Sequence, residues 1–327
     1  MRAAVVDKPG HIEIRDVPAP RLSSPSDILI RVLSASICNT TDYKSFAAED
    51  PEKVWPNNPH PFILGHECCG EIVEVGGEVD GFAQGDRIVF WTMPGGAFAE
   101  YACISAKDIA IGKLDERIPV TSAAIMEMVI GAARMLFGTD GKPLVSEGDR
   151  AVVYGLGPAG LIYVQLLKAM KAGSIAAVGR HEFRLRKAEQ FGADWLIDGK
   201  QDAPAEKTRE VLSGSPDVIV DATGGNIVAD VVSLSREGTI LVPYGIPPFS
   251  WQEKLGPLHE KGIVVASGGL DEARAAVPYC MDWAADGRVD LEALTTHVMP
   301  LEDVGRGLAL CRHEKDSTLK VVLGVTE

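Results

Sequence analysis

The stretch Arg150–Arg180 constrains the fold of this chain more than any other. The apolar run Ala151–Tyr154 is short and β-branched, which is typical of a buried parallel strand. Residues Gly155–Gly160 then fit the pattern G-x-G-x-x-G, and a helical run over Ala159–Ala172 leads to a second apolar strand at Ile175–Val178. Strand, glycine turn, helix and strand in this order predict a dinucleotide-binding βαβ unit.

Each glycine of this motif has a physical role. Gly155 permits the tight turn, Gly157 lets the backbone approach a pyrophosphate, and Gly160 lets helix and strand pack closely. The helix that follows presents free N–H groups and a partial positive charge to the phosphates. The alternative is a purely structural glycine turn. We predict a cofactor site formed by Gly155, Gly157, Pro158, Ala159 and Gly160.

Length and rhythm predict two domains in the 327 residues. Residues 1–110 contain short strand patterns between Gly, Pro and Asp, which favours an irregular antiparallel barrel. From about residue 120 strands and helices alternate, the rhythm of a doubly wound α/β sheet with six parallel strands. We expect these strands at 151–154, 175–178, 195–198, 217–221, 239–244 and 262–266. A helix near 271–286 and a last strand near 319–323 complete the prediction.

Charge and composition exclude several classes of function. The net charge of −14 leaves no basic surplus to neutralise phosphates, so nucleic acid is not expected as a partner. The sequence contains no apolar run long enough to cross a membrane. Six cysteines without a framework spacing fit a reducing compartment, and we expect a cytoplasmic protein.

The chemistry is expected in the first part of the chain. The segment Gly65–Gly70, followed by Gly76 and Val79, fits G-H-E-x-x-G-x5-G-x2-V, and Cys38 lies upstream. A thiolate and the imidazole of His66 from separate loops can converge on zinc, whose catalytic sites leave one position open. With a nucleotide motif downstream, such a site suits polarisation of an alcohol or carbonyl oxygen.

These motifs resemble those of the zinc-dependent alcohol dehydrogenases of the medium-chain dehydrogenase/reductase superfamily, over essentially the whole chain. Supporting stretches are Ala97–Tyr101 and Leu319–Leu323. The resemblance implies a GroES-like catalytic domain at residues 1–120, a Rossmann domain at 121–267, and a return to the catalytic domain at 268–327. It also implies a zinc-containing NAD(P)-dependent alcohol dehydrogenase that forms a homodimer or homotetramer.

The resemblance further implies a ligand set. Cys38 and His66 match two ligands of the catalytic zinc. The third ligand is expected to be Glu127, which matches the glutamate of the sorbitol-dehydrogenase-like branch, although a structural glutamate in an ion pair is the alternative. Glu67 is either another ligand or an outer carboxylate. Thr40 matches the hydroxyl that passes a proton between substrate and solvent.

Two departures from the family pattern stand out. The segment Cys38-Asn39-Thr40-Thr41-Asp42 carries one residue more than the common C-G-T-D, so Thr41 competes with Thr40, and Tyr43 stands where some members have a relay histidine. Between Gly70 and Glu100 there is no cysteine, so we expect one catalytic zinc and no structural zinc. We interpret Cys68, Cys69, Cys103, Cys280 and Cys311 as core residues.

The predicted substrate is a secondary alcohol, polyol, sugar or cyclitol, or the matching ketone. Two alternatives on the same fold remain. One is a zinc-independent enone or quinone reductase, and the other is a non-catalytic nucleotide-binding relative. Zinc analysis and a nucleotide titration discriminate among them.

The cofactor is expected to be NADP rather than NAD. NAD enzymes normally carry an acidic residue at the end of the second strand, and Gly179 is found there. Arg180 and Arg184 follow within one helical turn and suit a 2′-phosphate. The alternative is that both arginines only stabilise the start of an exposed helix.

Overall fold

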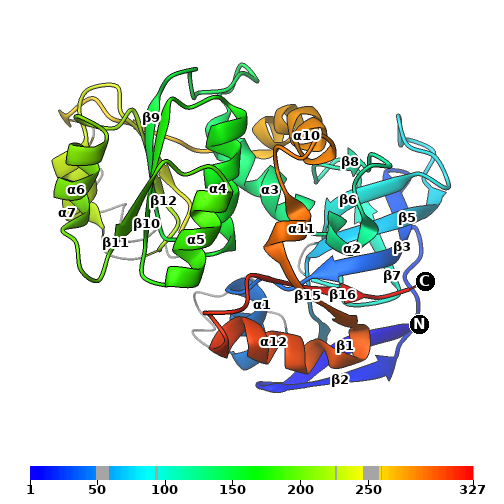
Figure 1. The fold of residues 1–327 in the computed structure, drawn as a ribbon. Helices are drawn as coiled ribbons and strands as arrows, with labels where there is room; N and C mark the ends of the chain where they lie inside the picture. The colour runs from blue at the N-terminus through cyan, green and yellow to red at the C-terminus, as the bar shows by residue number, and fades with distance from the viewer. Residues whose placement is uncertain (49–58, 93–94, 225–226, 246–257, 259, 327) are drawn as a thin grey trace. The chain divides into compact units, whose positions relative to one another are not determined.

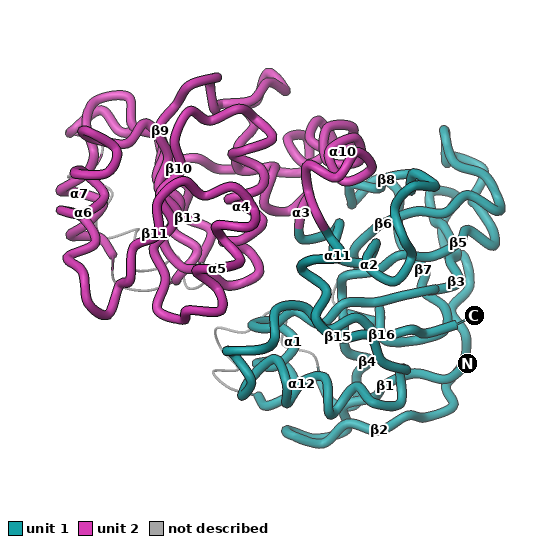
Figure 2. The backbone as a smooth tube through the Cα atoms, viewed as in Figure 1, with its two compact units in different colours: residues 1–128, 291–327 teal, residues 129–290 magenta. Residues whose placement is uncertain are grey.

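The computed structural model describes residues 1–48, 59–92, 95–224, 227–245, 258 and 260–326. The chain divides into two compact units, one formed by Met1–Met128 with Leu291–Glu327 and the other by Val129–Asp290 (Figure 2). These boundaries differ from the predicted ones, which followed residues 120 and 267. The second boundary is later because helix α10 (Leu270–Ala285) packs on the short helix η1 (Arg134–Leu136) of the second unit.

The first unit is built on two sheets (Figure 1). A three-stranded sheet has the order β2-β1-β4, and a seven-stranded sheet has the order β15-β16-β3-β5-β6-β8, with β7 paired to β3. Every pairing is antiparallel except that of β15 with β16, which agrees with the predicted irregular antiparallel barrel. The strands are β1 Arg2–Lys8, β2 His11–Asp16, β3 Asp27–Ser36, β4 Phe62–Ile63, β5 Glu67–Val75, β6 Arg87–Trp91, β7 Tyr101–Ser105, β8 Gly112–Lys113, β15 Thr295–Pro300 and β16 Lys320–Gly324. The helices are α1 Thr41–Ala47, α2 Val120–Ala123, α11 Leu291–Leu294, η2 Leu301–Asp303 and α12 Val304–His313.

The second unit contains a parallel sheet of six strands in the order β11-β10-β9-β12-β13-β14. This is the doubly wound Rossmann order, so the predicted fold class is confirmed. Its strands are β9 Arg150–Tyr154, β10 Ser174–Gly179, β11 Trp195–Asp198, β12 Val218–Asp221, β13 Ile240–Pro243 and β14 Val264–Val265. The other helices of its described residues are α4 Pro158–Ala169, α5 Glu182–Gln190, α6 Pro204–Val211 and α7 Val228–Leu234. Helix α3 (Met126–Ala133) contains the first unit boundary.

The core of the second unit follows from its sequence. The central strand β9 has neighbours on both edges, and its residues Ala151–Tyr154 are buried, as expected for a strand covered on both faces. Among the described residues no helix combines the length and apolar character needed to cross a membrane.

Candidate functional site

Strand register brings two distant loops of the first unit together. β3 and β5 pair antiparallel with Ser36 opposite Glu67, so the end of β3 lies beside the start of β5. Cys38 follows β3 by two residues and His66 immediately precedes β5. Because of this register, Cys38 and His66 are spatial neighbours although 27 residues lie between them in the sequence.

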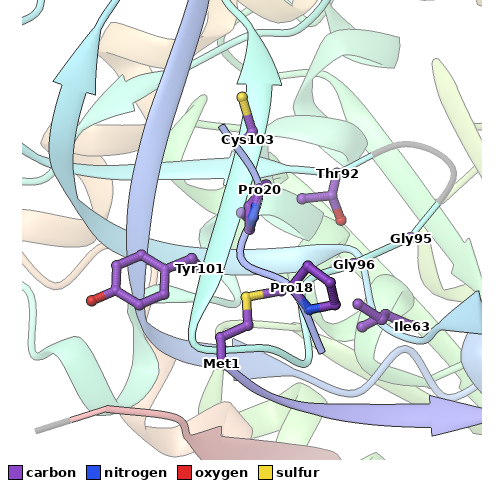
Figure 3. A pocket seen from close by; sticks show the side chains of 10 residues that line it. Met1, Pro18, Pro20, Ile63, Thr92, Gly95, Gly96, Tyr101 and Cys103 are labelled. Carbon is purple, nitrogen blue, oxygen red and sulfur yellow. The ribbon is translucent and has the colours of Figure 1, made fainter. Parts of the chain in front are cut away.

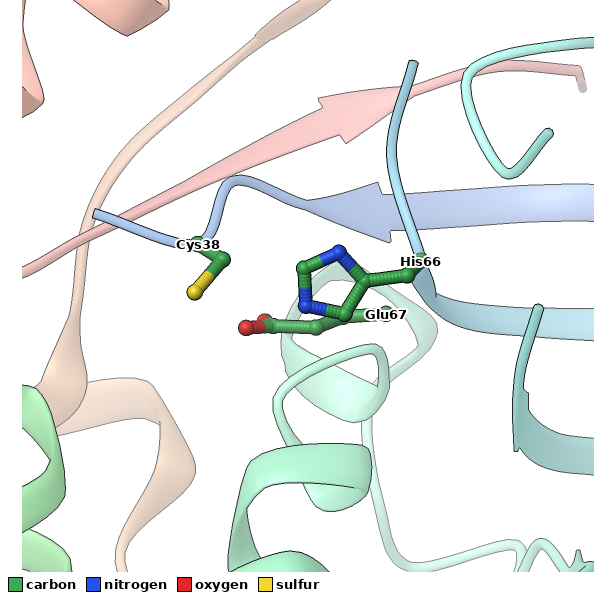
Figure 4. Close-up of side chains that lie close together, drawn as sticks. All are labelled: Cys38, His66 and Glu67. Carbon is green, nitrogen blue, oxygen red and sulfur yellow. The ribbon is translucent and has the colours of Figure 1, made fainter. Parts of the chain in front are cut away.

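Three potential metal donors converge at this point. One ligand atom each of Cys38, His66 and Glu67 lies within 4.8 Å of the other two (Figure 4). Among the described residues, this is the group of His, Cys, Asp or Glu side chains close enough together to hold a metal ion. In Figure 4 the Cys38 sulfur and the Glu67 carboxylate point toward each other beside the His66 ring. Sulfur, imidazole nitrogen and carboxylate oxygen are the donors that zinc uses, so the residues present fit that metal.

Asp42 orients two of these donors. Its Oδ1 lies 3.0 Å from His66 Nδ1, and its Oδ2 accepts a hydrogen bond of 2.8 Å from the Cys38 backbone N–H. A proton on Nδ1 shared with the carboxylate leaves Nε2 as the metal-facing nitrogen. Burial lowers the pKa of His66, but Asp42 and Cys38 outweigh burial and raise it well above its usual value. A metal binds only the neutral imidazole, so metal binding and protonation of His66 compete.

We expect Asp42→Asn to reduce zinc affinity or activity by about 10–100-fold, the range for carboxylates that orient a metal-bound histidine. The amide keeps the size of the side chain but loses the charge that holds the imidazole proton. Zinc content after dialysis and turnover measure the effect. Asp86→Asn is the matched control, because Asp86 belongs to the same unit and forms an ion pair of 2.7 Å with the exposed side chain of Lys113. Equal losses in the two variants would contradict the role of Asp42.

Glu67 has partners of its own. Its Oε2 accepts hydrogen bonds from Lys320 Nζ at 2.6 Å and from Ser36 Oγ. The side chains of Lys320 and Glu67 are 0% and 1% exposed, so this is a fully buried ion pair. Burial lowers the pKa of Lys320, but the charges of Glu67 and Cys38 outweigh it and the net pKa is raised. The lysine is therefore a cation at neutral pH.

Glu127 is not a member of the 4.8 Å group. It is the second residue of α3 and is partly exposed. Burial raises the pKa of the Cys68 thiol well above its usual value, and the negative charge of Glu127 is the next contribution. Glu127 thus acts electrostatically on a residue that directly follows Glu67, and the structure brings Cys38, His66 and Glu67 together more closely than it brings Glu127.

The two threonines considered for the proton relay differ in exposure. Thr40 is exposed and directly precedes α1, whereas Thr41 is partly buried. Tyr43, at the predicted outer end of the relay, carries the guanidinium of Arg312 at 4.8 Å from its ring centroid.

The glycine motif of the second unit has the predicted geometry. Gly155 adopts φ +88°, in the left-handed region, and a Cβ on Gly160 would lie 1.8 Å from the Gly155 carbonyl oxygen. By contrast, a Cβ on Gly157 would meet nothing within 4 Å. Gly157 is the N-cap residue of α4 and has no side chain that could cover the first N–H groups of the helix. Two glycines are thus required by packing, and the third faces open space before the helix N-terminus.

The residues predicted for the adenosine ribose follow β10. Gly179 ends this buried strand, and a Cβ there would lie 2.6 Å from Leu156 Cδ1. Arg180 comes next and is exposed, and Arg184 lies on α5 and is partly exposed.

A cavity of about 240 Å³ lies elsewhere in the first unit (Figure 3). It is lined by Met1, Pro18, Pro20, Ile63, Thr92, Gly95, Gly96, Tyr101, Ala102 and Cys103. The described residues that line it include none of those predicted to bind metal or cofactor. Cys68, Cys69, Cys280 and Cys311 are buried as predicted, but Cys103 is partly exposed. Burial raises the pKa of Cys103 to about 11, so its thiol stays protonated at neutral pH.

Sequence reasoning missed the roles of Asp42, Ser36 and Lys320. Asp42 entered only as a spacing marker, although a carboxylate shortly after a ligand cysteine was an available signal. A lysine within the apolar run Leu319–Leu323 was a second signal, because a buried ammonium requires a partner.

The sequence models of two domain families match this chain. The "Alcohol dehydrogenase GroES-like domain" matches residues 24–114, and the "Zinc-binding dehydrogenase" domain matches residues 158–284. The first match includes the metal donor group, and the second includes the helix of the glycine motif.

Characterised proteins resemble the chain along nearly its full length. It is 27% identical to the (R,R)-butanediol dehydrogenase of Bacillus subtilis, over 93% of this chain and 94% of the relative. It is 26% identical to the NADP-dependent isopropanol dehydrogenase of Thermoanaerobacter brockii, over 97% of both. The crystal structure of the rspB alcohol dehydrogenase of Escherichia coli CFT073, a complex with NADH, matches with a TM-score of 0.79 and 25% identity over 99% of both chains.

Proposed function

Because this chain belongs to the zinc-binding alcohol dehydrogenase family of the medium-chain dehydrogenase/reductase superfamily, we propose that it transfers hydride between a nicotinamide cofactor and a secondary alcohol or polyol. Zinc-containing, NAD(P)-dependent alcohol dehydrogenase activity follows from the family. The class of substrate is the part proposed here, with sugars, cyclitols and the corresponding ketones included. Two relatives are named for butanediol and isopropanol, both of which are secondary alcohols.

The observation that carries the proposal is the convergence of Cys38, His66 and a carboxylate in the unit that lacks the nucleotide motif. Zinc, when bound, supplies a Lewis acid that draws electron density from an alcohol or carbonyl oxygen. The chain supplies the rest: Asp42 fixes the imidazole, and the glycine motif provides backbone N–H groups for the cofactor phosphates. Donor set and nucleotide motif together make a hydride-transfer enzyme the best-supported function.

We propose that Cys38, His66 and Glu127 hold the zinc. Glu67 is the competing candidate because it lies closer to the other two donors. Its Oε2 is already bound to Lys320 and Ser36. Glu127 is a partly exposed carboxylate on α3, and its negative charge reaches the Cys68 thiol beside Glu67. This commitment of Glu67 supports Glu127 as the third ligand.

Two glutamate variants separate these assignments. We expect Glu127→Ala to lose zinc on dialysis and to cut activity strongly, since a ligand is removed. Glu67→Ala should retain zinc and reduce activity by about 10–100-fold through ligand orientation. Zinc per chain is measured by elemental analysis. If Glu67→Ala loses zinc and Glu127→Ala keeps it, the two assignments must be exchanged.

The proton of the substrate hydroxyl is proposed to leave through Thr40. Its hydroxyl follows Cys38 by two residues and its exposure gives it access to solvent. Thr41 is the alternative because it is adjacent in sequence and only partly buried. Thr40→Val and Thr41→Val distinguish the two hydroxyls by their effect on turnover.

We expect NADP to be preferred over NAD. The exposed guanidinium of Arg180 at the end of β10 supports this, because it suits a 2′-phosphate. Arg180→Ala should raise the Kd of NADP by about tenfold, or about 1.4 kcal/mol, and leave that of NAD nearly unchanged. Gly179→Asp is a less clean test, since its Cβ would displace Leu156.

Fluorescence titration with both dinucleotides makes this comparison. Arg186→Ala is the matched control, because Arg186 is an exposed arginine on α5, the helix that begins two residues after Arg180, and it pairs with Glu182 at 3.3 Å. A parent protein that binds NAD tenfold or more tightly than NADP contradicts the expectation. Such a preference corresponds to a difference in binding free energy of about 1.4 kcal/mol in favour of NAD.

The test of the proposed function is a panel of alcohols scored by nicotinamide reduction at constant zinc. We expect turnover with secondary alcohols or polyols and little with primary alcohols. Equal turnover of primary and secondary alcohols would contradict the proposed substrate class. Reduction of enones by a zinc-free preparation would instead support the alternative reductase.

A further inference from the structure

A lysine without exposed surface lies directly behind the metal donor group. Lys320 opens β16, which pairs with β3 so that Val322 lies opposite Ser36. Its Nζ donates 2.7 Å to the Ile37 carbonyl and 2.6 Å to Glu67 Oε2. Ile37 is the residue before Cys38. One ammonium therefore binds the loop that carries Cys38 and the carboxylate that follows His66.

The same loop is fixed to β16 at two further points. The Ile37 N–H donates to the Val321 carbonyl at 2.9 Å, and Asn39 Nδ2 donates to the Leu319 carbonyl at 3.0 Å. The backbone on either side of Cys38 is thus held without help from Lys320. Lys320 adds a hydrogen bond to the Ile37 carbonyl and, as its one charged contact with the donor group, the ion pair with Glu67.

Two donors bind the same oxygen of Glu67. Lys320 Nζ and Ser36 Oγ both bind Oε2, and the side chains of Glu67, Lys320 and Ser36 are 1% exposed or less. The ammonium and the carboxylate balance each other's charge inside the protein. Removing the cation would leave a buried, unpaired carboxylate within 4.8 Å of two metal donors. A divalent metal is then the nearest available positive charge.

We propose that Lys320 is a positioning residue that holds the Glu67 carboxylate outside the coordination shell of the metal and thereby keeps one coordination position open. The inference rests on the proposed zinc-dependent function and adds the reason why that site stays reactive. A catalytic zinc differs from a structural one by this open position, and a fourth protein ligand would close it.

A role in fold stability alone is a weaker account of this pair. A buried ion pair pays a large desolvation cost, and apolar side chains of similar volume often stabilise a fold as well or better. The test therefore needs a readout of metal coordination, which a purely structural ion pair would not change.

The experiment uses the full chain with Co²⁺ in place of zinc and records the visible absorption spectrum of the metal. Lys320→Met should weaken and shift the cobalt bands, because a carboxylate oxygen joins a four-coordinate site, and kcat should fall by at least about tenfold. Lys320→Met combined with Glu67→Gln should return the spectrum to that of the parent, since the neutral amide no longer competes for the metal. Lys113→Met is the matched control, because Lys113 pairs with Asp86 at 2.7 Å in the same unit but is 53% exposed.

A cobalt spectrum of Lys320→Met that equals the parent spectrum overturns the proposal. Thermal unfolding shows whether this variant folds. If it does not, Ser36→Ala decides, because it removes the other hydrogen bond to Oε2 and keeps the ion pair. It should shift the spectrum in the same direction by a smaller amount, and an unchanged spectrum then overturns the proposal. A parent protein that binds neither cobalt nor zinc refutes the proposed function instead.

Discussion

Replacing Cys38 with serine is expected to abolish turnover and leave dinucleotide binding intact. A serine hydroxyl stays protonated at neutral pH and is a poor zinc ligand, so the site loses one of its anionic donors. The loss should exceed the roughly 100-fold upper limit for residues that only orient a ligand. The fold should survive, because Asp42 binds the backbone N–H of residue 38 and not its side chain.

The measurement combines turnover with a fluorescence titration of the cofactor. The glycine motif lies in the second unit, which has its own core, so its affinity should match that of the parent. Cys103→Ser is the matched control, since Cys103 is also a partly exposed cysteine of the first unit. Near-normal activity of Cys38→Ser would show that the proposed mechanism is wrong.

Alanine at Gly160 and at Gly157 should have opposite kinds of effect. At Gly160 the new Cβ would lie 1.8 Å from a backbone oxygen, so strand and helix must separate. Overpacking of this kind costs about 1–3 kcal/mol, and Gly160→Ala should lower the free energy of unfolding of the cofactor-free protein. At Gly157 no atom lies within 4 Å of the new Cβ, and stability should change by less than about 0.5 kcal/mol.

The cofactor affinities complete this comparison. We expect Gly157→Ala to weaken dinucleotide binding by about tenfold or more, or about 1.4 kcal/mol, because its methyl group enters the space proposed for the pyrophosphate. Denaturant unfolding without cofactor and fluorescence titration with it separate the two effects. Normal dinucleotide affinity in Gly157→Ala would place the phosphates elsewhere.

The α/β part of the chain was predictable because each strand can be recognised from its own short stretch of sequence. Strands buried on both faces, such as β9, appear as continuous apolar runs. All six strands of the sheet, including the more exposed edge strands β11 and β14, were predicted within about two residues. The strand β15 was missed because Thr295–Pro300 begins with three polar residues and only Met299 in it is buried. Its pairing partner β16 follows it by 19 intervening residues, a non-local contact that no sequence window contains. For the same reason the unit boundaries differ from the predicted ones.

The candidate site was predictable only where a motif spans it. Cys38, His66 and the three glycines stand in recognisable patterns. The partners of these residues depend on strand register, since Lys320 reaches Glu67 across 252 intervening residues. Glu127 shows the converse: the sequence suggested it by resemblance, while the contacts among the described residues favour Glu67 as a neighbour of Cys38.

The central claim is that catalysis depends on a single zinc per chain, and zinc titration of the metal-free protein tests it most directly. The chelator-treated protein should be folded and inactive with NADP and a secondary alcohol. Turnover should then rise linearly with added zinc and level off at about one equivalent, as expected for one catalytic site. Activity that survives complete zinc removal, or that requires two equivalents, would contradict the account.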